Sequence, residues 1–292
     1  MILINVVNVK YHIGYTRNLA LISFIELVAL ASFSGLTIFL GLPLALLQQV
    51  SSHKKGFLNA LAIGILLFLI TDVFNHAWDS ASGAAVAASL GKGTALDAGL
   101  DLLAMLGGIA VGLLSLVFYE SRFMVRRPAA EGATAGMVED HTSYKLAMMI
   151  ATGIGAHNFS EGLAIGQSYV AGSIGLALIL IIGFGAHNAT EGFGIASPLT
   201  RLNGRPKVGF LATAGLVGGG PTFLGTIVGS LWTSTFVYIL FLSIAGGALV
   251  YVSLLMFNSG RRHTTNGVMM AGIFVGLCAG FLTDLLVTLG GA

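Results

Sequence analysis

Long apolar stretches follow one another along almost the whole chain and limit what it can fold into. A helix that crosses the hydrocarbon core of a bilayer needs about 20 mostly apolar residues. Hydrophobic residues make up 55% of the chain and charged residues 9%, against about 25% charged residues in soluble domains. Eight stretches are long enough, at approximately 19–47, 56–79, 97–119, 144–169, 172–199, 208–231, 234–257 and 265–290. The sequence therefore predicts an all-α membrane protein in which residues 1–292 form a single polytopic membrane domain with eight transmembrane helices.

Basic residues are divided unevenly between the two sets of loops that alternate along these spans. The set that includes both termini holds Lys10, Arg17 and Lys92, and the other set holds the remaining 11 of the 14 Lys and Arg residues. Cytoplasmic loops of membrane proteins carry the excess of Lys and Arg. We therefore expect an integral protein of the plasma membrane with both termini outside the cell.

The main polar interruption, at 120–143, is predicted to be a cytoplasmic loop. It separates three spans from a central pair, and three more spans follow that pair. This 3+2+3 layout is typical of transporters built from two inverted halves. We expect the central pair to form an antiparallel hairpin, because very few residues connect its two spans.

The central pair carries the same pattern twice, His-Asn-x-x-Glu-Gly. The first motif is His157–Gly162 and the second is His187–Gly192. A full charge at the centre of a membrane helix costs roughly 2.5–3.5 kcal/mol on insertion scales. One His–Glu pair could be a buried hydrogen bond that fastens its own helix. Two pairs at matched depth on adjacent spans favour a functional site.

Residues four apart in a helix lie on one face, so each motif stacks its histidine on its glutamate. If the two motifs face each other, two imidazoles and two carboxylates converge at the bilayer midplane. Two carboxylates balance a divalent cation, and imidazole selects transition metals over magnesium and calcium. Zinc accepts this donor set in tetrahedral geometry. Asn158 and Asn188 offer carbonyl oxygens, or hydrogen bonds that hold the carboxylates.

At these residues the chain resembles the ZIP (Zrt/Irt-like) family of divalent metal transporters. Residues 157–166 are similar to the fourth-helix signature of that family, and His187, Glu191 and Gly192 match its fifth helix. The resemblance implies eight spans, outward termini and a homodimer. It also implies that His157, Glu161, His187 and Glu191 are the main transport-site ligands, with Asn158 beside them.

Several positions depart from the family pattern, and all of them remove carboxylates. Asn188 and Gly192 stand where many members have further ligands on the fifth helix. Three glycines, 218–220, precede Pro221 where the sixth helix often carries a glutamate. The seventh span has no charged residue from Phe236 to Phe257. We therefore expect one metal ion per protomer.

A second group of metal-ligating side chains lies on the second span. Asp72, His76 and Asp79 are spaced i, i+4 and i+7, which places them on one helical face. The predicted topology puts this face near the outer surface, where acidic residues concentrate cations. We interpret the three residues as an outer capture site; the alternative is that they are ordinary solvated residues at the end of a helix.

These observations predict a carrier that moves a divalent transition metal ion toward the cytoplasm. Zinc ranks first among the candidate ions, which also include iron, manganese, cobalt, nickel and cadmium. The ion is a transported substrate, and no prosthetic group is expected. Apart from the metal ion and the lipid bilayer, the sequence indicates no partner such as a nucleic acid. The alternative is a membrane-embedded metal-dependent hydrolase, although Asn follows both motif histidines where a zinc protease has Glu in H-E-x-x-H. A di-iron oxygenase and a metal sensor fit the sequence less well.

Overall fold

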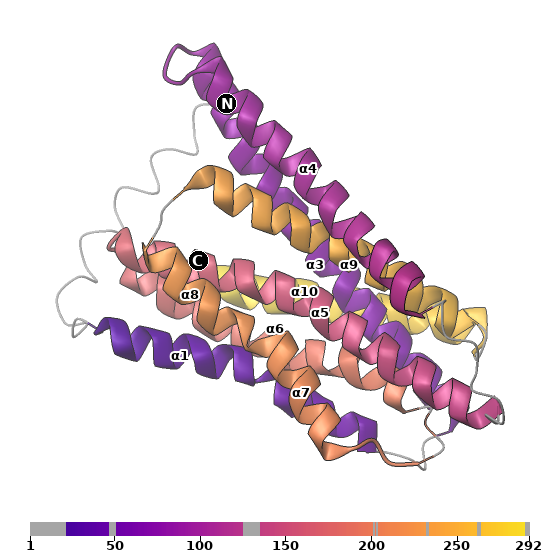
Figure 1. Ribbon diagram of the computed structural model, residues 1–292. Helices are drawn as coiled ribbons and strands as arrows, with labels where there is room; N and C mark the ends of the chain where they lie inside the picture. The colour runs from indigo at the N-terminus through magenta and orange to yellow at the C-terminus, as the bar shows by residue number, and fades with distance from the viewer. Residues whose placement is uncertain are drawn as a thin grey trace.

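The structure, a computed structural model, describes residues 22–46, 51–124, 135–200, 202, 204–231, 234–261 and 264–289. Within these residues the chain is helical and contains no strand, which confirms the predicted fold class. The elements are α1 (Phe24–Leu36), α2 (Ile38–Gly41), the 3-10 turn η1 (Leu42–Leu46), α3 (Ser52–Ser89), α4 (Ala95–Tyr119), the π-helical turn η2 (Glu120–Met124), α5 (Ala135–Val170), α6 (Ile174–Leu199), α7 (Val208–Gly219), α8 (Pro221–Leu231), α9 (Thr235–Arg261) and α10 (Asn266–Leu289) (Figure 1).

Seven segments of the described chain are long and apolar enough to cross a membrane. Two of these spans are interrupted helices. The first consists of α1, α2 and η1, and the sixth predicted span is divided into α7 and α8 at Gly220. The segment that falls outside the seven is α5, since His157, Asn158 and Glu161 lower its hydropathy. It nevertheless runs through the middle of the bundle, in contact with α6, α8 and α9 (Figure 1).

Several helices extend beyond their predicted bounds. The prediction ended the second span at residue 79, but α3 continues to Ser89, because its last ten residues include five alanines and no proline. The predicted loop at 120–143 is helical at both ends, where η2 continues α4 and where α5 begins at Ala135. A hydropathy window finds the apolar part of a helix and misses the part that continues into the polar region.

The helices pack in pairs that mirror each other. The second span, α3, packs on the last, α10, and the third, α4, packs on the seventh, α9. On the central hairpin, α6 packs on α1 and α2, while α5 packs on α7 and α8. These pairings relate the first three spans to the last three, as expected for inverted halves around the α5–α6 hairpin.

The glycine that ends each motif allows one of these close contacts. A Cβ at Gly162 of α5 would lie 2.2 Å from the carbonyl oxygen of Thr222 in α8. A Cβ at Gly192 of α6 would lie 2.2 Å from the carbonyl oxygen of Ile38 in α2. Both contacts are backbone to backbone, as in other membrane helix pairs that use small residues. The hairpin is therefore held against both halves at the level of the two motifs.

Candidate metal centre

The two motifs face each other across the α5–α6 interface, and their side chains meet at one carboxylate. His157 and Glu161 lie one turn apart on α5, with 3.2 Å between His157 Nε2 and Glu161 Oε1. Nε2 of His187, on α6, contacts the same oxygen. Ligand atoms of these three residues all lie within 4.8 Å of one another. The two imidazole rings are inclined by 29°, with centroids 6.2 Å apart.

Glu191 lies at the edge of this group. Its Oε1 is 4.0 Å from His157 Nε2, and its Oε2 accepts a hydrogen bond of 3.1 Å from the Asn158 amide. Asn158 therefore holds one oxygen of Glu191 and leaves the other directed toward His157. The structure thus brings His157, Glu161 and His187 into one tight cluster, with Glu191 close to it.

Burial leaves several of these polar atoms unsatisfied. His157, Glu161 and Glu191 are all less than 5% exposed, and His187 is partly buried. Nδ1 of His157, Oε2 of Glu161 and Oε1 of Glu191 have no hydrogen-bond partner, and Nε2 of His157 meets only the Glu161 and Glu191 carboxylates. Buried polar groups normally have one, because an unpaired group costs free energy. Imidazole nitrogens and carboxylate oxygens in this state have lone pairs that a metal cation can bind.

The two motif asparagines connect the hairpin to breaks in the flanking spans. The amide of Asn158 also donates a 2.9 Å hydrogen bond to the carbonyl of Gly218, just before the break between α7 and α8. The amide of Asn188 donates a 3.3 Å hydrogen bond to the carbonyl of Ser34, just before the break between α1 and α2. Asn158 thus contacts a site carboxylate, while the hydrogen bond of Asn188 goes to a neighbouring helix. Neither side-chain oxygen has a hydrogen-bond partner.

A cavity of about 530 Å³ leads away from the cluster. His157, Glu161 and His187 line it at one end. Its other walls come from the halves of α3, α5, α6, α9 and α10 that the predicted topology assigns to the outer side. These walls consist of Phe68, Asp72, Val73, Asn75, His76, Ser160, Ala164, Ser168, Leu176, Leu180, Phe184, Tyr238, Leu242, Asp284 and Thr288. The cluster is therefore reached from the end of the bundle where α5 ends and α6 begins.

The outer residues singled out in the sequence are only partly brought together here. Asp72 and His76 line the cavity, with 3.4 Å between Asp72 Oδ1 and His76 Nδ1. Asp79 is exposed and lies outside the lining. Asp284 of α10 lines the same cavity. Spacing on α3 could not group Asp284 with Asp72, because more than 200 residues separate them.

The family model of the ZIP zinc transporters matches residues 125–287, which is more than half of the chain. This chain belongs to the ZIP family. The matched segment contains both motifs and extends from α5 into α10. No curated protein matches the sequence. ZIP proteins are membrane transporters of divalent metal ions, so the chain is an integral membrane metal transporter and not an enzyme. The hydrolase alternative is thereby excluded.

Proposed function

We propose that this ZIP protein carries zinc toward the cytoplasm, one ion at a time, through His157, Glu161, His187 and Glu191. The observation that carries the proposal is the convergence of buried donors from α5 and α6 on one point at the end of a cavity. Two imidazoles and two carboxylates suit tetrahedral zinc and leave the site with the ion electrically neutral. Iron, manganese, cobalt, nickel and cadmium are the competing substrates.

The asparagines have different roles in this proposal. Asn158 orients Glu191 as a hydrogen-bonding neighbour of the ion, in the way that partners of metal ligands usually do. Asn188 maintains the position of α6 through Ser34 and serves the site indirectly. The single-ion stoichiometry is supported by the three glycines, 218–220, that precede Pro221 where other family members often carry a glutamate. The Asn158 amide is already bonded to Glu191 and to the carbonyl of Gly218.

The proposed outer capture site differs from the predicted one, because it consists of residues that line the cavity. We propose that Asp72 and His76 of α3, together with Asp284 of α10, attract the hydrated ion before it reaches the cluster. Asp79 was part of the predicted group, but it lies outside the cavity lining and is given no role in capture.

Inward transport requires that the central site is exposed to the two sides in turn. The membrane potential favours this direction, since each elementary charge gains about 2.3 kcal/mol per 100 mV and a divalent ion gains roughly 4.6. The proposed orientation, with both termini outside and the cavity opening outward in the plasma membrane, is supported by the uneven distribution of Lys and Arg among the loops. A homodimer is proposed from the family resemblance.

The test is flux into liposomes that contain the purified protein and a trapped metal indicator. Zn, Fe(II), Mn, Co, Ni and Cd are supplied in turn outside the vesicles. We expect Glu161→Ala to abolish flux, because both histidines contact this carboxylate. His141→Ala, which removes an exposed histidine far from the motif on α5, is the matched control and should transport normally. Undiminished flux through Glu161→Ala would refute the proposed site.

A further inference from the structure

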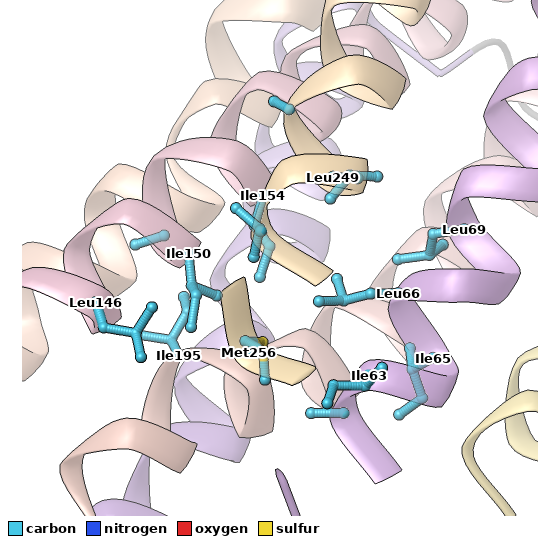
Figure 2. Packing of buried hydrophobic residues seen from close by; sticks show 14 of the residues in the cluster. Ile63, Ile65, Leu66, Leu69, Leu146, Ile150, Ile154, Ile195, Leu249 and Met256 are labelled. Carbon is cyan, nitrogen blue, oxygen red and sulfur yellow. The ribbon is translucent and has the colours of Figure 1, made fainter. Parts of the chain in front are cut away.

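The inner side of the bundle, where α5 begins and α6 ends, is closed by apolar side chains. Ile150 and Ile154 of α5, Ile195 of α6, Leu66 of α3, and Leu249 and Met256 of α9 come together there (Figure 2). Each is at most 1% exposed. All six belong to one packed cluster, and none of them lines the cavity. The central cluster is thus separated from the inner side by this apolar plug.

A hydrogen bond between two buried polar side chains lies among these apolar residues. Asn59 of α3 is 2% exposed, and Ser197 of α6 is equally buried. The Ser197 hydroxyl donates a 3.0 Å hydrogen bond to Oδ1 of Asn59. The Asn59 amide in turn reaches the carbonyl oxygen of Met256 in α9, at 3.4 Å. The contact joins α3, α6 and α9 near their inner ends, where α3 begins at Ser52 and α6 ends at Leu199.

We propose that Asn59 and Ser197 form a latch that holds the inner side closed while the cavity is open to the outer side. Both are positioning residues, which act on the equilibrium between the two states without touching the ion. For the site to open inward, the inner end of α6 has to separate from α3 and α9, and this separation breaks the Ser197–Asn59 hydrogen bond. The inference rests on the alternating exposure proposed above.

Removal of one partner of this hydrogen bond leaves the other partner buried without a hydrogen bond. Without the Ser197 hydroxyl, Oδ1 of Asn59 stays buried and unpaired as long as the inner side is closed, and it meets water when that side opens. A net hydrogen bond shifts an equilibrium of this kind by roughly two- to twelvefold. The latch therefore predicts that Ser197→Ala increases the population of the inward-open state by that factor.

A second reading is that the contact merely fastens three helices. That reading predicts lower stability on loss of Ser197, with no preference for opening at the inner side. A buried serine in the same region separates the two readings. Ser253 of α9 is 4% exposed, and its hydroxyl has no hydrogen-bond partner. Ser253→Ala therefore removes the same atom from the inner half without breaking a latch.

The experiment is cysteine labelling of the full chain in detergent, where reagent reaches both sides and the result depends on neither orientation nor transport. The exposed Cys278 is replaced by serine, and Ile150→Cys places the probe inside the plug. We expect a water-soluble maleimide to label Ser197→Ala two- to twelvefold faster than the parent and Ser253→Ala at the parent rate. Ser197→Thr, which keeps the hydroxyl, should restore slow labelling.

A double variant gives an independent result. Asn59→Leu combined with Ser197→Ala leaves no unpaired amide in the closed state, so the double variant should label more slowly than Ser197→Ala alone. Equal labelling of Ser197→Ala and the parent, or an equal rise in Ser253→Ala, overturns the latch. If the labelling rates differ as expected but the protein shows no metal flux, the proposed transport function is contradicted and the latch is still supported.

Discussion

Replacing Gly192 by alanine tests whether close backbone contact sets the geometry of the candidate metal centre. The added Cβ would lie 2.2 Å from the carbonyl oxygen of Ile38 and 2.8 Å from Cα of Gly41. Ordinary contacts of this kind lie at 3.4 Å or more, so α2 and α6 have to separate by about 1 Å. Overpacking of a tight interface costs typically 1–3 kcal/mol. Because Glu191 precedes Gly192 and His187 lies on the same helix, this displacement also moves two proposed ligands.

The assay combines thermal unfolding in detergent with zinc flux in liposomes. We expect Gly192→Ala to lose about 1–3 kcal/mol of stability and to transport zinc at least roughly tenfold more slowly, since sites tolerate only about 0.5 Å of misplacement. Gly194→Ala is the matched control, because its Cβ would meet nothing closer than 3.8 Å. It should behave like the parent. If the two variants transport zinc at the same rate, backbone contact at Gly192 does not govern the site.

Two further predictions concern residues around the site. Asp72→Asn should raise the zinc concentration needed for half-maximal flux several-fold with little change in maximal rate, because capture precedes binding at the cluster. Asp79→Asn should leave both values unchanged. Equal effects of the two substitutions would contradict the proposed capture site. Asn158→Leu should weaken zinc binding by about 10–100-fold, because Glu191 loses the partner that orients it. Zinc titration of the purified variants checks this, and Asn188→Leu, whose hydrogen bond goes to Ser34, should lower stability more than affinity.

The sequence alone predicted the helical membrane fold and the pairing of the two motifs on one hairpin. Both follow from local pattern, since hydropathy marks the spans and the four-residue spacing places His157 next to Glu161. The convergence of His187 on the same carboxylate oxygen required only that the two helices be antiparallel and matched in depth. The close packing at Gly162 and Gly192 gives a reason for these motif glycines, which the metal-ligand interpretation did not explain.

Other features could not be read from local pattern. The amide of Asn188 bonds Ser34 of α1, 154 residues earlier in the chain, and Ser197 bonds Asn59, 138 residues earlier. Asp284 joins Asp72 in the cavity wall only because α10 packs on α3. Such contacts depend on how the spans are arranged in the bundle, and a single sequence carries no periodic signal for them.

Zinc X-ray absorption spectroscopy of the purified protein, loaded with one equivalent of metal, shows directly whether one zinc ion binds between His157, Glu161, His187 and Glu191. We expect four nitrogen or oxygen ligands at about 2.0–2.1 Å, with the scattering of two imidazoles. His187→Ala should remove the scattering of one imidazole. A six-oxygen shell without imidazole scattering, or a spectrum that His187→Ala leaves unchanged, would contradict zinc binding at this site.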